Sequence, residues 1–195
     1  MKISVPFDKR RADCLGKLDK SNIGFWDDKI KGLCEKINKR KEFYTTSSCA
    51  GRIVLLKQED KKGENRFVFR THDKISFEDL KKELSKIEKS KEKGREKGVI
   101  YFKQEACILH VACRDLGDAQ DFLKKAKLSG WKKSGIMNIG ERIMLELMST
   151  EAIVFPIMDK GKILVSDGFL KLIVKEANKK LERSWEKIQN FERMI

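Results

Sequence analysis

The sequence predicts an α+β fold, in which mixed sheets are flanked by helices. Apolar residues recur at helical spacing in four segments, and they alternate with polar residues in the extended segments between them. The chain has neither a GxGxxG sequence after a strand nor a GxxxxGK[S/T] loop. A doubly wound, Rossmann-type methyltransferase or dinucleotide-binding domain is therefore not expected.

The first helix follows a basic, weakly patterned arm, residues 1–22, which we expect to pack only in part. This helix is expected to end near residues 39–41. Two extended segments then cover residues 43–56 around a turn at Ala50-Gly51, and residues 66–70 form another strand. The apolar face of the helix consists of Trp26, Ile30, Leu33, Cys34 and Ile37.

The middle of the chain is expected to hold a capped helix and a hairpin. Ser76 and Asp79 have the spacing of a capping box, which opens a helix with Phe77, Leu80, Leu84 and Ile87 on one face. Residues 89–97 carry no apolar side chain, which is typical of an exposed loop or a frayed helix end. The two strands at residues 99–102 and 107–113 are expected to pair as a hairpin.

The last third is expected to alternate between helix and strand. Asp115 caps a short helix, and residues 141–148 alternate as a strand after a turn at Gly140. Residues 153–155 read as a short edge strand, because Pro156 lacks the N–H that a ladder needs. The final helix carries an apolar stripe of Leu170, Ile173, Val174, Ala177, Leu181, Trp185, Ile188 and Phe191.

The length of 195 residues suits a single domain, 1–195, and its two halves are similar. Each half has a helix, an extended segment, a glycine turn, an arginine and an apolar strand. The arginines are Arg52 in the first half and Arg142 in the second. We interpret this as an internal duplication of about 23–97 and 98–165, with the helix 166–193 packing on both. The two glycine turns would then face one cleft.

The charge of the chain favours a nucleic-acid partner. It has 44 basic and 30 acidic residues, a net charge of +14, and cations that meet phosphates release condensed counterions. The alternative is a solvated surface rich in Lys and Glu. Five cysteines without CxxC spacing and two histidines make a structural zinc site unexpected. With no signal sequence or membrane span, a cytoplasmic location is expected.

Residues 45–52 are the most distinctive segment for function. Four consecutive hydroxyl residues precede a turn with Gly51, and Arg52 follows directly. Hydroxyls, turn amides and a guanidinium together can hold a carboxylate or a phosphate. The alternative is a Thr/Ser-rich strand on a solvated sheet face. Cys49 could act as a nucleophile only with a lowered pKa and a base, and small buried side chains of this kind are more common.

Two histidines lie near strand ends, where loops often carry function. His72 and His110 could each serve as a general base, or each could be a structural histidine with satisfied hydrogen bonds. Arg70 and Arg114 occupy comparable places in the two halves and could contact phosphates. Trp131 could belong to the core or stack on a base, and the core is the more common role.

The chain resembles the tRNA wybutosine-synthesizing protein 3 family, and its length is closest to the archaeal branch. Two positions depart from the family pattern: Ala50 replaces a serine, and Glu151 stands where some eukaryotic members have histidine. The resemblance runs almost from end to end. It rests on Phe7-Asp8-Lys9, the YTTSSCAGRI block of residues 44–53, Thr71-His72, Leu109 to Asp115, Asp118-Ala119-Gln120, Ser134-Gly135-Ile136, Ser149-Thr150, Pro156 and the helix after Val165.

The resemblance implies methyl transfer from S-adenosylmethionine to tRNA-Phe. The acceptor would be N4 of the 4-demethylwyosine-type tricyclic base at position 37, just 3′ of the anticodon. We expect His72 to be the base or to orient the substrate, and we expect no metal. Cofactor binding is assigned to Ser47, Ser48, Gly51, Arg52, Ser134 and Gly135, and tRNA binding to Arg70, His110 and Arg114. The competing hypothesis is a non-catalytic RNA-binding protein, which would bind tRNA without a cofactor.

Overall fold

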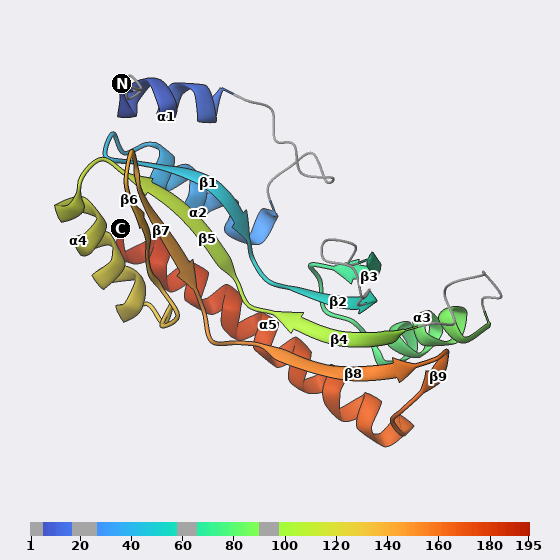
Figure 1. Cartoon of the computed structure of the whole chain (residues 1–195). Coiled ribbons are helices and arrows are strands. Elements are labelled where there is room, and N and C mark those ends of the chain that lie inside the picture. Colours follow the sequence, from blue (N-terminus) through green and yellow to red (C-terminus); the bar gives the residue numbers. More distant parts are fainter. Residues whose placement is uncertain (1–5, 17–26, 58–65, 90–97) are drawn as a thin grey trace. The chain divides into compact units, whose positions relative to one another are not determined.

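The computed structural model describes residues 6–16, 27–57, 66–89 and 98–195. Its helices and antiparallel strands confirm the α+β class (Figure 1). The expected loop at 89–97 and Trp26 of the first helix fall almost wholly outside the described residues. In the part that is described, no helix is long and apolar enough to cross a membrane.

The chain forms two compact units, and each is built from separate stretches of sequence. The first contains Met1–Ala50, Cys107–Thr150 and Ser184–Ile195, and the second contains Gly51–Ala106 and Glu151–Arg183. These boundaries differ from those of the expected halves, 23–97 and 98–165. The helix α5 (Asp167–Met194) contributes its first part to the second unit and its last part to the first.

The first unit contains a four-stranded sheet of order β1-β5-β7-β6. All its neighbouring strands are antiparallel. Asp27 caps α2 by accepting from the backbone N–H of Lys29, and Asp115 caps α4 by accepting from that of Asp118, as its sequence position predicts. The elements are α1 (Phe7–Leu15), α2 (Asp28–Asn38), β1 (Phe43–Cys49), β5 (Ile108–Cys113), α4 (Leu116–Leu128), β6 (Gly135–Ile139) and β7 (Ile143–Met148).

One face of this sheet packs against α2, α4 and the end of α5. In the core, Phe122 of α4 contacts both Phe43 of β1 and Phe191 of α5. The ring centroids of Phe43 and Phe122 are 4.6 Å apart, and those of Phe122 and Phe191 are 5.1 Å apart. Trp131 is fully buried here, and its indole N–H donates to the carbonyl of Lys187. Trp131 therefore belongs to the core. Burying each such side chain contributes about 1.5–3 kcal/mol.

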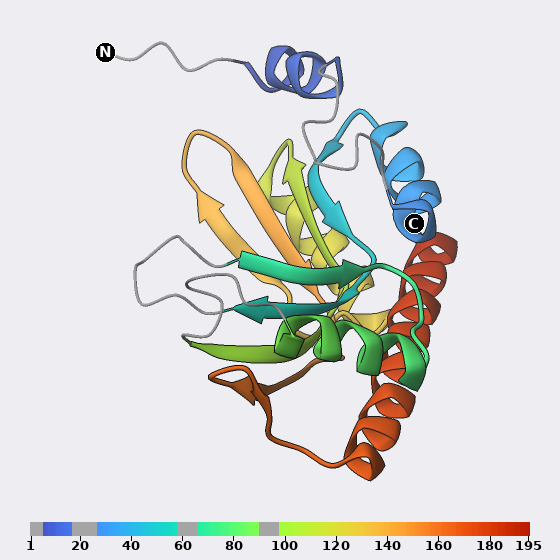
Figure 2. The same ribbon diagram turned by 90° about the vertical axis from the view of Figure 1, so that its right-hand side faces the viewer.

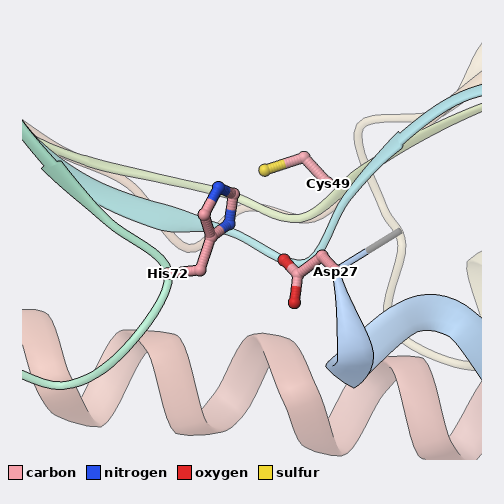
Figure 3. Close-up of side chains that lie close together, drawn as sticks. All are labelled: Asp27, Cys49 and His72. Atoms are coloured by element: carbon pink, nitrogen blue, oxygen red, sulfur yellow. The ribbon is translucent and has the colours of Figure 1, made fainter. Parts of the chain in front are cut away.

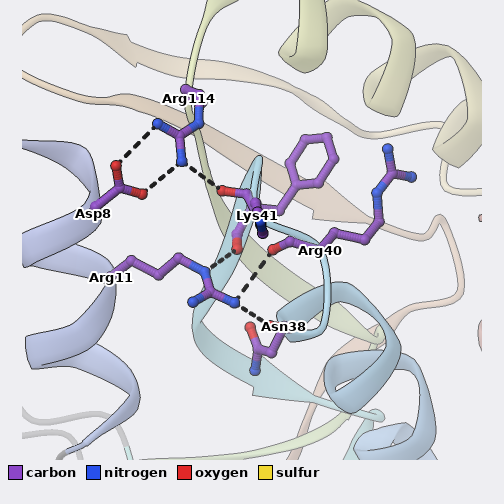
Figure 4. Close-up of polar contacts among 7 residues, drawn as sticks. Asp8, Arg11, Asn38, Arg40, Lys41 and Arg114 are labelled. Atoms are coloured by element: carbon purple, nitrogen blue, oxygen red, sulfur yellow. Dashed lines mark hydrogen bonds and ion pairs between the residues drawn. The ribbon is translucent and has the colours of Figure 1, made fainter.

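The opposite face of the same sheet is partly covered by α1, a helix that the sequence pattern did not predict. Phe7 and Cys14 of α1 pack against Tyr44, Ala112 and Met144. No residue of α1 is itself buried, which explains why its sequence lacks a recognisable apolar stripe. Ionic contacts hold it instead: Arg114 binds the Asp8 carboxylate, and Arg11 donates to the carbonyls of residues 38, 40 and 43 (Figure 4).

The second unit contains a five-stranded sheet of order β3-β2-β4-β8-β9. Helix α3 lies beside these strands (Figure 2), and Asn178 of α5 hydrogen-bonds both backbone groups of Ile75 just before α3 begins. Ser76 and Asp79 form the expected capping box. The elements are β2 (Arg52–Lys57), β3 (Arg66–Thr71), α3 (Phe77–Lys89), β4 (Val99–Glu105), β8 (Ile153–Asp159) and β9 (Lys162–Ile163).

One expected strand pairing is wrong: β4 and β5 do not form a hairpin, because they belong to different sheets. The two extended segments on either side of Ala50-Gly51, β1 and β2, are likewise divided between the two sheets. Gly51 has a φ of 99°, a backbone conformation that L side chains rarely adopt. β6 and β7 pair on either side of the expected turn at Gly140. The two glycine turns that suggested a duplication therefore have different structures.

The strand around Pro156 is longer than expected. β8 continues through Pro156 to Asp159, and a register shift against β4 accommodates the proline. β9 pairs only with Met158 and Asp159. Among the described residues, β8 therefore has no strand partner on its outer side at Pro156, which agrees with the missing N–H. Its last residues, Met158 and Asp159, do have a partner there, β9.

Candidate functional site

The hydroxyl-rich block does not form one loop. Residues 45–50 belong to the first unit, whereas Gly51 and Arg52 belong to the second. Thr45 is hydrogen-bonded to the last residue of α2. The Asn38 side chain accepts from the backbone N–H of Thr45 and donates to its hydroxyl. The Ser48 hydroxyl contacts the Cys34 thiol on the same helix-covered face. The pairing of β1 with β5 has a bulge at Thr46, between Thr45 and Ser47. The Thr46 hydroxyl lies 3.5 Å from the carbonyl oxygen of His110.

Four residues form a row straight across the four-stranded sheet. Ser47 on β1 lies opposite His110 on β5, His110 lies opposite Glu146 on β7, and Glu146 lies opposite Gly135 on β6. Residues directly opposite each other in an antiparallel sheet project from the same face. The structure therefore brings together three of the predicted residues: Ser47 and Gly135, which were assigned to cofactor binding, and His110, which was assigned to tRNA binding.

The polar centre of this row is an imidazole–carboxylate pair. His110 Nε2 lies 3.0 Å from a Glu146 carboxylate oxygen, and their side chains are 25% and 39% exposed. An ionised carboxylate only accepts, so Nε2 carries the proton of this hydrogen bond. In the neutral ring, Nδ1 then holds the lone pair. His110 can therefore accept a further proton while Glu146 keeps its ring oriented.

Space is available beside this pair. A Cβ atom built on Gly135 would meet no neighbouring heavy atom within 4 Å. Two residues further along each strand, Cys49, Ile108 and Met148 line up on the same face and are each half-buried. The row is thus a polar pair bordered by apolar side chains and an open position, a combination that suits a flat, polar-edged ligand.

Glu146 was missed by the sequence analysis. It sits in the alternating segment 141–148, where a charged residue between apolar ones is typical of a solvated strand face. Its alternation placed it on the face away from the core, which is correct. The pairing with His110 depends on the register of β5 against β7, and no local pattern carries that information.

Asp27 is a second polar residue that sequence reasoning did not single out. Its carboxylate caps α2 and also accepts from the backbone N–H of Ala50 at 3.0 Å, which fixes the end of β1. The Asp27 carboxylate and the Cys49 sulfur lie within 4.8 Å of each other (Figure 3). Its position just before a helical pattern was the signal for an N-cap, and the contact to Ala50 could not be foreseen.

In the second unit, Arg52 and His72 each have a fixed orientation. Arg52 Nε donates to Glu105 at 2.5 Å, and its guanidinium lies 4.9 Å from the centre of the Phe67 ring. His72 Nδ1 lies 3.2 Å from the carbonyl oxygen of Gly51. A carbonyl oxygen only accepts, so Nδ1 carries the proton and the neutral His72 ring has its lone pair at Nε2.

Two predicted site residues have structural partners instead of open positions. The Ser134 hydroxyl donates to the Trp131 carbonyl at 2.6 Å and accepts from the Met148 N–H at 3.0 Å. Arg114 forms a bidentate pair with Asp8 (Figure 4). This pairing holds the pKa of the Asp8 carboxyl below its usual value and raises that of Arg114. Ser134 therefore stabilises the β6–β7 hairpin, and Arg114 tethers α1.

Comparison with known proteins identifies one consistent group. The family model described as methyltransferase TYW3 matches residues 9–195. A human tRNA wybutosine-synthesizing protein 3 homolog is 35% identical over 195 residues, which covers 96% of this chain and 71% of the relative. A tRNA(Phe) 7-((3-amino-3-carboxypropyl)-4-demethylwyosine(37)-N(4))-methyltransferase from Methanocaldococcus jannaschii is 33% identical, covering 84% and 82%.

A solved structure agrees with this grouping. The PH1069 protein from Pyrococcus horikoshii superimposes with a TM-score of 0.84 at 28% sequence identity. The match covers 96% of this chain and 92% of that protein. The same fold therefore extends over nearly the whole of both chains.

Proposed function

The chain belongs to the methyltransferase TYW3 family, and from this premise we propose that it methylates N4 of a 4-demethylwyosine-type tricyclic base at position 37 of tRNA(Phe). The resemblance drawn from the residue pattern is confirmed. Family membership makes the chain a tRNA methyltransferase of wyosine and wybutosine biosynthesis, so the non-catalytic alternative is not retained. The proposed acceptor follows the name of the Methanocaldococcus jannaschii relative.

The observation that carries the proposed site is the row Ser47–His110–Glu146–Gly135. A tricyclic base is flat and has hydrogen-bonding edges, and this row offers a hydroxyl, an imidazole and a carboxylate beside an open position. A base in position 37 lies in the anticodon loop, where it can be extruded and bound in a shallow site. We place the methyl acceptor on this face of the four-stranded sheet.

The proposed methyl donor is S-adenosylmethionine, and the row fits its polar ends. When bound, S-adenosylmethionine supplies an electrophilic methyl carbon on a positively charged sulfur. The Ser47 hydroxyl can donate to its carboxylate, and the Glu146 carboxylate can face its positive charge. Gly135 leaves room for either ligand. Ser48 and Arg52 could join only by exchanging their present partners, Cys34 and Glu105.

The acceptor nitrogen carries a proton that must leave during methylation. We propose that His110 accepts this proton at Nδ1, while its Nε2–H bond to Glu146 fixes the ring. The assignment of the same role to His72 stays a prediction. Its Nδ1 lies 3.2 Å from the Gly51 carbonyl oxygen, so this ring also has a defined orientation.

Methyl incorporation tests the function directly. The protein is incubated with S-adenosylmethionine labelled in the methyl group and with tRNA(Phe) that carries the base without its N4 methyl. We expect one labelled methyl group per tRNA, located at position 37 by mass spectrometry of nuclease fragments. Fully modified tRNA(Phe) is the matched control and should take up no label. Tight, salt-sensitive tRNA binding without any S-adenosylmethionine binding would refute the proposal.

A further inference from the structure

The five-stranded sheet of the second unit has one face that its helices do not use. Phe102 and Phe155 point to the helix-covered face, because Phe102 stacks on Phe155 and Phe155 contacts Phe169 of α5. Side chains alternate along a strand, so the neighbours of these residues project from the other face. On that second face, Val154 is 60% exposed and Phe67 is 41% exposed, whereas Val54 and Leu56 of the central strand β2 are buried. We call it the open face of the second unit.

The open face interleaves aromatic and basic side chains. One row in register runs from Arg70 through Val54 and Lys103 to Val154. The adjacent row runs from Phe67 through Leu56 and Tyr101 to Pro156. Residues that lie directly opposite each other on neighbouring strands project from the same face, so each row belongs to one face. The two rows lie side by side because Val54 and Leu56 are two residues apart on β2.

Arg52 completes this arrangement beside the exposed aromatic ring. It projects from the same side of β2 as Val54 and Leu56, and its guanidinium covers the Phe67 ring at 4.9 Å. Glu105 is paired with Arg52. The pair holds the guanidinium plane over the ring, and the Arg70 and Lys103 cations remain alongside. An exposed aromatic ring, Phe67, and an exposed cation, Arg70, thus lie on β3, with the half-buried Tyr101 and Lys103 on β4 in the same two rows.

We propose that the open face of the second unit binds unpaired nucleotides of the tRNA substrate. Each nucleotide has a flat base and a phosphate, and the rows of the open face present aromatic rings next to cations at strand spacing. An acidic protein partner would use the cations but has no group that matches the rings in this regular way. This inference rests on the proposed function, since it deepens the identity of the tRNA contact.

The roles within this surface differ by chemistry. Phe67 and Tyr101 would stack on bases, which contributes affinity with little dependence on sequence or salt. Arg70 and Lys103 would contact phosphates, and their contribution should weaken as salt rises. The prediction of Arg70 as a tRNA-binding residue thereby gains neighbours that sequence reasoning did not find, because Phe67 and Lys103 join it only through strand register.

The test measures the affinity of a fluorescently labelled tRNA(Phe) anticodon stem-loop by anisotropy, using the full chain. Phe67→Ala is expected to weaken binding about tenfold at every salt concentration. Arg70→Gln and Lys103→Gln should weaken it severalfold at low salt, and each should reduce the slope of log affinity against log salt by about 0.7. Lys175→Gln, an exposed site on α5 with the same change of charge, is the control.

Several outcomes would overturn the proposal. Affinities of all three variants equal to that of Lys175→Gln would do so, provided that their thermal unfolding matches the parent chain. A change of oligomeric state with Phe67→Ala, seen by analytical ultracentrifugation without loss of RNA affinity, would identify a second copy as the occupant instead. S-adenosylmethionine affinity is measured in parallel and should not change.

Failure of this surface and failure of the proposed function are distinguishable. If the parent chain methylates tRNA(Phe) while all three variants bind it normally, the open face is not the RNA contact, yet the function stands. If the variants lose RNA affinity but no methyl group is transferred by the parent chain, the open face stands and the reaction is wrong.

Discussion

In the proposed mechanism Glu146 positions His110, and the roles of the two residues can be separated by substitution. Glu146→Gln keeps an oxygen that can accept from His110 Nε2 but removes the negative charge that steadies a protonated ring. We expect single-turnover methylation to slow about 10- to 100-fold and the pH at which the rate levels off to move. Rates are measured by label transfer over a pH series.

The matched control for that variant is Glu186→Gln, an exposed residue of the same unit. It makes the same change of charge away from the row and should leave both the rate and the pH profile unchanged. A Glu146→Gln variant with the parent pH profile would remove Glu146 from the mechanism, even if its rate were lower.

Three buried thiols predict how stability responds to alkaline pH. Burial raises the pKa of Cys34 to about 12, that of Cys107 to about 11 and that of Cys113 to about 12, from an ordinary value of 9.0. Their neutral forms are thus favoured in the folded chain. The stability that they contribute is fully present below pH 9 and falls as pH rises toward 11–12, because the unfolded thiols ionise first.

This prediction is checked by urea unfolding at intervals above pH 8. Other groups also titrate there, so the parent chain is compared with Cys34→Ala, which lacks one of the three thiols. The difference in unfolding free energy between the two should shrink steadily above the ordinary thiol pKa. A constant difference over that interval would mean that Cys34 ionises in the folded chain as easily as in the unfolded one.

At the scale of elements, α1 is held by charge more than by apolar burial. Arg114 and Asp8 pair at the surface, with side chains 38% and 72% exposed, and the pKa of Asp8 is lowered chiefly by this hydrogen bond. Arg114→Gln should therefore raise hydrogen exchange in residues 7–15 several-fold and leave α4 unchanged. The Asp8 contribution is present above its ordinary pKa and is lost as pH falls below it.

Lys9→Gln, a change of charge on an exposed side chain of the same helix, provides the control and should alter exchange little. Equal exchange in the parent chain and Arg114→Gln would show that the packing of Phe7 on Tyr44, rather than the ionic pair, retains α1.

Sequence reasoning succeeded for elements whose signal is local. α2, α3, α4 and α5 were predicted because their apolar faces repeat at helical spacing, and Ser76 and Asp115 mark helix starts by their own chemistry. α1 was missed because it has no buried residue. The hairpin expected around residue 106 was wrong because the choice between two sheets depends on partners far along the chain.

The same division holds for the site. Ser47 and His110 stood out by residue type, but their common row with Glu146 follows from the register of three strands. Ser134 and Arg114 stood out equally and proved to have backbone or carboxylate partners. Residue type therefore identified the candidate site residues. The strand register and tertiary contacts were needed to separate those in the row from those with structural partners.

At the scale of the whole molecule, the net charge of +14 predicts a surface that binds tRNA and is not merely solvated. If Arg70 and Lys103 both meet phosphates, log affinity for the stem-loop should fall against log salt with a slope of about −1.4 or steeper. Anisotropy titrations over a series of KCl concentrations measure it. A slope near zero would favour the alternative of a charged surface without a nucleic-acid role.

The most direct test of the proposed site compares the two histidines. Single-turnover methyl transfer to the precursor tRNA(Phe) is measured across pH for His110→Gln and His72→Gln, with saturating S-adenosylmethionine and tRNA. Our proposal predicts that His110→Gln slows transfer about 10²- to 10⁴-fold and loses the pH dependence of a base, whereas His72→Gln retains that dependence. A His110→Gln variant with the parent rate and pH profile would contradict it.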